Sequence, residues 1–147
     1  MLLLSPQNFS DYELIDVGNF EKLERFGQYI TIRPEPQAVW EPKLNAQQWR
    51  EKAHVKFVAK SSSSGNWDKL KNMPDRWNIE YKVGSKQTTV SSLKFRLALT
   101  SFKHVGIFPE QAVNWDYIAE SISLLKTTEP KFLNLFAYTG AASLAAK

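Results

Sequence analysis

Hydrophobic and polar residues alternate with a period of two over much of the first hundred residues. This pattern is typical of β-strands that bury one face. The segments that show it best are residues 12–17, 28–33, 54–59, 77–83 and 93–102. In the last of these, one face carries Leu93, Phe95, Leu97 and Leu99. We therefore predict that residues 1–103 are mostly β-structure.

Glycine and proline residues divide these segments. Gly18-Asn19 predicts a turn, and Gly27 predicts a tight turn that would pair segments 12–17 and 28–33 as antiparallel strands. The prolines at positions 34, 36 and 42 disfavour a long helix around residues 38–40. Asn45 is a candidate cap for a short helix that continues to about Ala53. The serine-rich segment 61–65 is expected to connect two strands as a hairpin loop.

The period changes after Gly106. Pro109 followed by Glu110 is a helix-start signal. Apolar residues then recur at spacings of three and four, which predicts an amphipathic helix of about four turns. The positions in question are Trp115, Ile118, Ile122 and Leu125. Glu129-Pro130 is expected to end this helix.

A short apolar run and a glycine turn close the sequence. Residues 132–136 are typical of a fully buried parallel strand, and residues 138–140 of a turn before a helix over residues 141–146. The predicted fold class is α+β, with a β-rich N-terminal module (residues 1–103) followed by the truncated start of a doubly wound α/β domain (residues 104–147). One parallel strand cannot form a sheet, so we expect the chain to be a fragment of a longer protein.

Composition narrows the class of protein. The chain has 147 residues, no cysteine and 13% aromatic residues, so disulfides and thiolate chemistry are excluded within it and a packed core is expected. No apolar stretch approaches the ~20 residues that span a bilayer. We therefore expect a cytoplasmic protein with no membrane association. His54 and His104 are isolated in sequence, and we predict no metal site.

The net charge of +4 is unevenly distributed. Residues 41–103 contain thirteen basic and five acidic side chains, a balance of +8, whereas the segments before and after are slightly acidic. The same segment contains aromatic residues, namely Trp49, Phe57, Trp67, Trp77 and Tyr81. Basic side chains among aromatic rings are typical of RNA-binding surfaces. The alternative is a solvated basic face over a small aromatic core.

The strand, glycine turn and helix near the C-terminus are the candidate site of chemistry. A helix N-terminus after such a turn can receive a carboxylate or a phosphate, and Gly140 permits a positive φ or the close approach of a ligand. The chain has no G-x-G-x-x-G and no G-x-S-x-G, so neither a hydride-transfer enzyme nor an esterase is favoured. Ordinary β–α packing is the alternative interpretation of this segment.

Residues 132–143 (FLNLFAYTGAAS) resemble motif I of class I S-adenosylmethionine (SAM)-dependent methyltransferases. More narrowly, they resemble the branch that includes bacterial large-subunit rRNA methyltransferases. Residues 104–115 (HVGIFPEQAVNW) are similar to the family's segment before motif I, and residues 21–27 (EKLERFG) to the N-terminal hairpin of its shorter members. The resemblance therefore reaches most of the chain.

The resemblance implies a SAM site. The turn formed by Phe136, Ala137, Tyr138, Thr139 and Gly140 would cradle the amino acid end of SAM. Two residues at the entry of the preceding helix, Phe108 and Gln111, would lie beside the same pocket. The alternative role of Phe108 and Tyr138 is packing in a core. The alternatives for Gln111 are helix capping and simple exposure at the surface. Asn134 departs from the acidic residue that many members carry there. The family's ribose-binding and acceptor-binding motifs are absent from this sequence, so the catalytic residues are not among these 147.

Three hypotheses follow from these patterns. The first is the N-terminal part of a SAM-dependent methyltransferase that acts on RNA, with rRNA as the expected class, and this chain alone is then expected to be inactive. The second is a non-enzymatic RNA-binding or assembly module, and the third is a non-functional truncated product. If they are exposed, the apolar residues near the C-terminus predict self-association: Phe132, Leu133, Leu135 and Leu144.

Overall fold

A computed structural model describes residues 4–6, 9–61, 64–84, 91–125, 127 and 129–147. The chain forms two compact units, and each is assembled from separate stretches of sequence. The sheet unit consists of the described residues of 10–79 and 96–106. The helix unit consists of the described residues of 80–95 and 107–147 with the N-terminus as far as Phe9. The predicted domains, residues 1–103 and 104–147, are instead contiguous in sequence, and that division stays a prediction.

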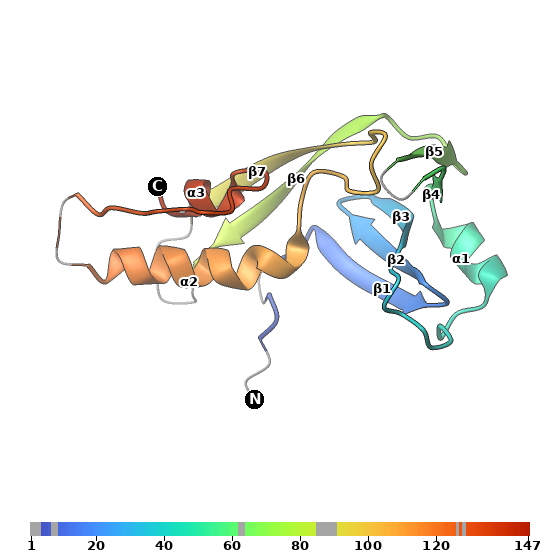
Figure 1. Cartoon of the computed structure of the whole chain (residues 1–147), viewed down its shortest axis with the longest axis horizontal. Helices are drawn as coiled ribbons and strands as arrows, with labels where there is room; N and C mark the ends of the chain where they lie inside the picture. The colour runs from blue at the N-terminus through green and yellow to red at the C-terminus, as the bar shows by residue number, and fades with distance from the viewer. Residues whose placement is uncertain (1–3, 7–8, 62–63, 85–90, 126, 128) are drawn as a thin grey trace. The chain divides into compact units, whose positions relative to one another are not determined.

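A five-stranded sheet with the order β1-β2-β3-β4-β5 forms the centre of the sheet unit (Figure 1). All neighbours are antiparallel except β3 and β4, which are parallel and joined through helix α1. Its elements are β1 (Tyr12–Gly18), β2 (Glu21–Phe26), β3 (Tyr29–Pro34), α1 (Ala46–Lys52), β4 (Val55–Ala59) and β5 (Gly65–Lys69). These bounds confirm the predicted strands at residues 12–17, 28–33 and 54–59. Strands β4 and β5 pair antiparallel, as the expected hairpin requires, and residues 62–63 of the segment between them lie outside the described residues.

The pairing expected for the first two predicted strands was wrong. A two-residue turn with positive φ at Asn19 (49°) and Phe20 (64°) leads from β1 directly into β2. Strand β2 then lies between β1 and β3 and pairs with both. The alternation of β2 is hidden in the sequence, because Glu24 on this strand is buried and hydrogen-bonded to Arg33.

Helix α1 begins where the sequence predicted. The Asn45 side chain accepts a hydrogen bond from the Gln48 N–H (2.9 Å), and the Gln48 side chain accepts one from the Asn45 N–H (2.9 Å). This reciprocal pair satisfies two amides at the helix start. The helix buries Trp49 against Leu23 and Ile32 on one face of the sheet, which fixes α1 over that face.

Strands β6 (Arg76–Val83) and β7 (Ser91–Ala98) form a separate two-stranded sheet. Both were predicted, but β7 ends at Ala98 rather than at residue 102. Leu93, Phe95 and Leu97 are buried on one face as expected, whereas Leu99, beyond the end of the strand, is only half-buried.

In the helix unit, a 3-10 turn η1 (Pro109–Gln111) leads into α2 (Ala112–Ser123), which confirms the predicted helix and its start. Trp115 is buried and packs among the rings of Phe9, Tyr81 and Phe95. The helix ends at Ser123, before the predicted stop, and Leu125 lies exposed beyond it. None of the described helices combines the length and apolar character needed to cross a bilayer.

The predicted buried strand at residues 132–136 was wrong. These residues form no strand and are exposed: Phe132 by 42%, Leu133 by 80%, Leu135 by 75% and Phe136 by 76%. Among the described residues no strand pairs with them, and a strand needs a neighbour to satisfy its backbone groups. Helix α3 (Ala141–Ala145) follows as predicted. The α+β class is therefore confirmed, whereas a doubly wound sheet is not formed by the described residues.

Candidate functional site

A pocket of about 460 Å³ lies between the start of α2 and the segment that ends in α3. Six of the seven predicted site residues line it: Phe108, Gln111, Phe136, Ala137, Tyr138 and Thr139. The seventh, Gly140, is not in the lining but lies between two residues that are, Thr139 and Ala141. The structure therefore gathers residues from two separate segments around one cavity, and their role in binding a cofactor stays a prediction.

The turn into α3 depends on Gly140. Its φ of 84° lies in the left-handed region, and its N–H donates to the Ala137 carbonyl oxygen (2.6 Å). A Cβ built on Gly140 would meet no atom within 4 Å. A side chain here is therefore disfavoured by backbone conformation rather than by crowding, and the space beside the turn is open.

Tyr138 also has a positive φ, at 47°, which is uncommon for a bulky residue. Its ring is 73% exposed and contacts the Phe108 ring at a centroid distance of 5.2 Å. The contact holds the turn against the entry to α2. Both rings line the pocket, so packing and contact with a ligand are compatible here.

Polar side chains at the start of α2 complete one wall. Gln111 precedes α2 but makes no capping hydrogen bond with its side chain. Its Oε1 instead accepts from Nδ2 of Asn114 (2.8 Å), and both amides line the pocket. The capping alternative for Gln111 is therefore not what the structure shows.

Asn134 ties the segment before the turn to α3. Its Nδ2 donates to Oγ of Ser143 (2.9 Å), and its Oδ1 accepts from the Phe136 N–H (3.3 Å). An amide fits this position because it both donates and accepts, which a carboxylate does not. Asn134, which departs from the family pattern, thus links the segment before the turn to α3.

Nine residues of the lining were missed in the sequence analysis, and three of them lie on α2: Asn114, Trp115 and Ile118. Their spacing from Gln111, by three, four and seven positions, places all four on one side of α2. The helical periodicity of this segment could have identified these three residues from the sequence. The described lining combines apolar and aromatic side chains with the amides of Gln111, Asn114 and Asn134, so it can hold a ligand.

No protein-family model matches the chain, and no curated protein matches it. Among solved structures it is similar to a SAM-dependent methyltransferase from Agrobacterium tumefaciens, with 35% sequence identity and a TM-score of 0.81 over 99% of this chain. The chain spans 43% of the length of that protein. The predicted resemblance to SAM-dependent methyltransferases is therefore confirmed at the level of the class, whereas the rRNA branch stays a prediction.

Proposed function

We propose that the chain is part of a SAM-dependent methyltransferase and that the pocket beside Gly140 receives the amino acid end of SAM. The similarity to the Agrobacterium methyltransferase over 99% of the chain carries this proposal. The gathering of residues 108, 111 and 136–139 around one pocket supports it, because the resemblance to motif I implies that these same residues surround the cofactor.

The pocket has suitable chemistry for that end of the cofactor. Phe108 and Tyr138 offer aromatic surface to the carbon chain, while the Thr139 hydroxyl and the amide groups of Gln111 and Asn114 are partners for its polar groups. SAM would supply an electrophilic methyl group on its sulfonium. The residues of this chain would bind and orient it, and the residues that act on the acceptor base would lie outside this segment.

We propose RNA, with rRNA as the expected class, as the methyl acceptor. The balance of +8 over residues 41–103 supports a polyanionic substrate. The intact methyltransferase would combine this segment with further sequence, and the 147-residue chain alone would bind SAM weakly and transfer no methyl groups. A chain that binds RNA but never SAM would instead be an RNA-binding module.

Calorimetric titration of SAM into the full-length protein tests the cofactor. We expect binding of one SAM per chain. Gly140→Val should weaken it by about tenfold or more, because the side chain would enter the open space and disfavour the positive φ. Leu144→Ala, an exposed change on the same helix outside the pocket lining, should leave SAM affinity unchanged. The absence of heat at millimolar SAM would overturn the proposal.

The acceptor is tested separately. Full-length protein with radiolabelled SAM should label rRNA but not protein or lipid, and RNA affinity should fall steeply as salt rises. Affinity that is unchanged between low and physiological salt would contradict an interaction with phosphates. Methyl transfer by the purified 147-residue chain would contradict the expected inactivity.

A further inference from the structure

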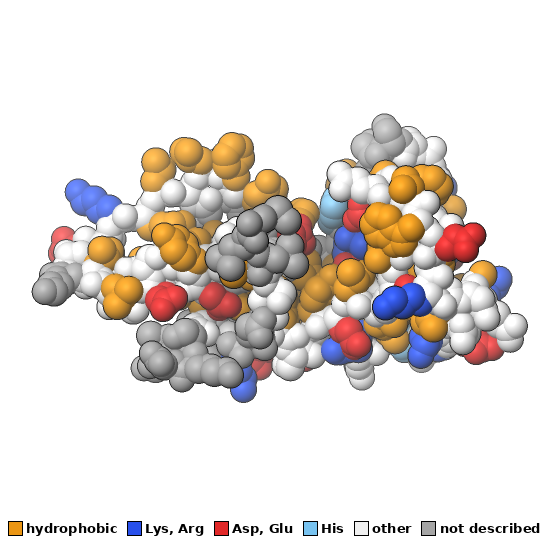
Figure 2. All heavy atoms as spheres, turned by 90° about the horizontal axis from the view of Figure 1, so that it is seen from below, with side chains coloured by type: hydrophobic (Ala, Val, Ile, Leu, Met, Phe, Trp, Pro, Cys, Tyr) orange, Lys and Arg blue, Asp and Glu red, His pale blue; other side chains and the backbone are white. Residues whose placement is uncertain are grey.

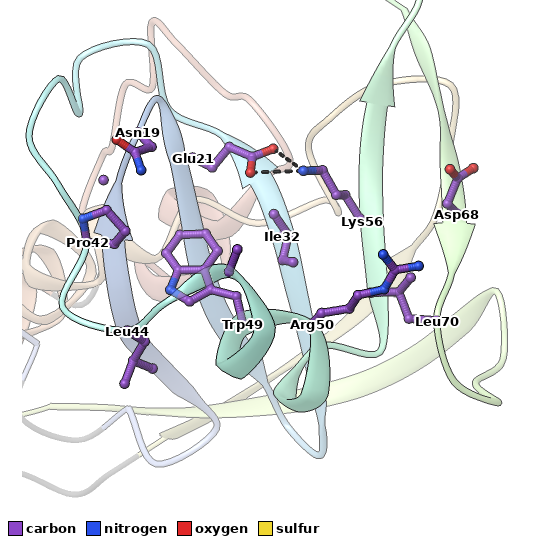
Figure 3. Close-up of a pocket in the computed structure, with 12 residues that line it drawn as sticks. Asn19, Glu21, Ile32, Pro42, Leu44, Trp49, Arg50, Lys56, Asp68 and Leu70 are labelled. Carbon is purple, nitrogen blue, oxygen red and sulfur yellow. Dashed lines mark hydrogen bonds and ion pairs between the residues drawn. The ribbon is translucent and has the colours of Figure 1, made fainter.

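A second pocket, of about 400 Å³, lies in the sheet unit between α1 and one face of the five-stranded sheet (Figure 3). Figure 3 shows the Glu21–Lys56 ion pair together with the side chains of Trp49 and Arg50, both from α1. All of its lining residues belong to the sheet unit. It therefore shares no residue with the pocket beside Gly140.

The strand register builds one wall of this second pocket. Ile32 on β3 lies opposite Lys56 on β4, and Lys56 lies opposite Asp68 on β5. These three side chains therefore form a row across the sheet on the face that α1 covers. Lys56 Nζ also lies 2.8 Å from Oε1 of Glu21 on β2, so its charge is partly neutralised.

The floor of the second pocket is apolar and fixed. Trp49 is only 6% exposed, and its Nε1 donates to the buried carboxylate of Asp16 (2.8 Å). Leu44 and Leu70 pack, half-buried, against the same core cluster. A planar apolar ligand would meet a preformed surface here, which lowers the entropic cost of binding.

The rim offers two exposed groups of opposite charge, Arg50 and Asp68. Neither forms an ion pair with another residue in the described part of the chain. A guanidinium suits a phosphate, and a carboxylate accepts a hydrogen bond from the exocyclic amino group of a base. An apolar floor between such groups fits a ligand with a flat ring, an amino edge and an anionic tail.

We propose that the second pocket binds one unpaired RNA nucleotide whose base carries an exocyclic amino group. The base lies on Ile32, Leu44 and Leu70, its amino group donates to Asp68, and its phosphate contacts Arg50. The nucleotide must be unpaired, because the stacked and paired bases of a duplex cannot reach the floor. This inference rests on the proposal that the substrate is RNA, and it assigns the sheet unit a role in recognising it.

The test compares fluorescein-labelled 12-nucleotide strands of cytidine and of uridine by anisotropy, with the full chain and without SAM. Cytosine has the exocyclic amino group and uracil does not. We expect the cytidine strand to bind about tenfold more tightly, and Asp68→Ala to abolish that preference. Glu41→Ala, which removes an exposed carboxylate outside the pocket, should keep it. Equal affinity of the wild-type chain for both strands overturns the proposal.

Arg50→Glu should weaken binding of both strands by about tenfold. Lys52→Glu is the matched control, because it makes the same charge change on the same helix outside the pocket lining. Equal losses in the two variants would show a diffuse charge effect and overturn the proposed site. Without any variant, addition of cytidine monophosphate should shift the methyl NMR signals of Leu44 and Leu70, and unchanged signals contradict the site.

The two proposals fail separately. If SAM binds but cytidine and uridine strands are not distinguished, the methyltransferase proposal stands and the nucleotide site is wrong. If the strands are distinguished but SAM produces no heat, the nucleotide site stands as part of an RNA-binding module.

Discussion

The sheet unit and the last nineteen residues of the chain, 129–147, satisfy their apolar and polar groups to very different degrees. In the sheet unit, every strand from β1 to β5 has a hydrogen-bonded neighbour, and buried carboxylates are paired. In residues 129–147, four large apolar side chains before the turn are exposed and form no strand. Figure 2 shows hydrophobic side chains exposed over the part of the molecule that carries α2 and this segment.

This difference shows that a hydrophobic pattern specifies a strand only where the chain also supplies the strand's neighbours. The sheet unit supplies its own partners, so its local patterns and its tertiary contacts agree. Residues 132–136 have the composition of a buried strand, but the described residues contain no neighbouring strand to bury them. Their hydrophobic pattern alone therefore does not determine a strand in this chain.

Hydrogen exchange should show the largest contrast between the two regions. Backbone amides in β2, which is paired on both edges, should exchange about a thousandfold or more slowly than in an unfolded chain. Amides of residues 131–136 should exchange nearly as fast as in an unfolded chain. Mass spectrometry of peptides from the two regions measures both rates. Strong protection at residues 131–136 would show that they are paired in solution and would remove the contrast.

Asp16→Ala should cause the largest loss of stability. Asp16 is 6% exposed and accepts hydrogen bonds from the Leu44 N–H (2.8 Å), from Trp49 Nε1 (2.8 Å) and from the Lys43 N–H (3.1 Å). Removing the carboxylate leaves these donors unpaired, and we expect the free energy of unfolding to fall by about 3 kcal/mol. Urea denaturation followed by tryptophan fluorescence measures it. Glu41→Ala, which removes an exposed carboxylate from the loop that contains Lys43 and Leu44, should change it by less than about 0.5 kcal/mol.

The same variant has a pH signature. Burial raises the pKa of the Asp16 carboxyl, but the hydrogen bonds from Leu44, Trp49, Lys43 and Val17 outweigh it and leave the pKa below its usual value of 3.8. A lowered pKa in the folded state means that the carboxylate stabilises the fold above pH 3.8 and loses this effect as the pH falls further. The stability difference between wild type and Asp16→Ala should therefore shrink in acid. A difference that grows below that pH would contradict the assignment.

Most elements of the sheet unit could be predicted from the sequence, because the residues that start and end them are close together along the chain. Asn45 predicts where α1 begins, and Gly18-Asn19 predicts the first turn. Strand β2 was missed because burial of its Glu24 depends on Arg33, whose guanidinium lies 2.6 Å from it on the neighbouring strand. Such a pair is invisible to a pattern of hydrophobic residues, because a buried charge has the same sequence signature as an exposed one.

The candidate site was predicted on a different basis. A positive φ at Gly140 follows from local chemistry, whereas the placement of Phe108 and Gln111 beside residues 136–140 came from the resemblance alone. Asn114 was missed although its spacing on α2 places it beside Gln111. The second pocket was not predicted at all, because its row of Ile32, Lys56 and Asp68 exists only once the strands are in register.

The exposed segment should also make the chain associate with itself. We expect the wild-type chain to form dimers or larger species at tens of micromolar, because burying exposed leucines is favourable by about 1.5 kcal/mol or more per side chain. The double variant Leu133→Lys and Leu135→Lys should raise the dissociation constant by about tenfold or more. Val39→Lys, at a position 71% exposed in the sheet unit, is the matched control and should change it little. A monomeric wild-type chain by light scattering would contradict this expectation.

The smallest predicted change in stability should come from protonation of His54 in the sheet unit. Its Nδ1 accepts a hydrogen bond from the Ile30 N–H (3.1 Å), so the neutral ring is the form that fits. Burial, together with the positive charge of Lys71, lowers the pKa of His54 below its usual 6.5. The folded state then binds fewer protons than the unfolded state in this range, so stability is full above pH 6.5 and declines as the pH falls below it.

Urea midpoints measured at pH 7.5, 6.5 and 5.5 check the His54 prediction. His54→Asn keeps an acceptor near the Ile30 N–H but has no proton to gain, so its midpoint should depend less on pH than that of the wild type. His104→Asn leaves the His54 interaction in place and should retain the wild-type dependence. If His54→Asn and wild type lose stability equally between pH 7.5 and 5.5, His54 is not the group responsible and the prediction is wrong.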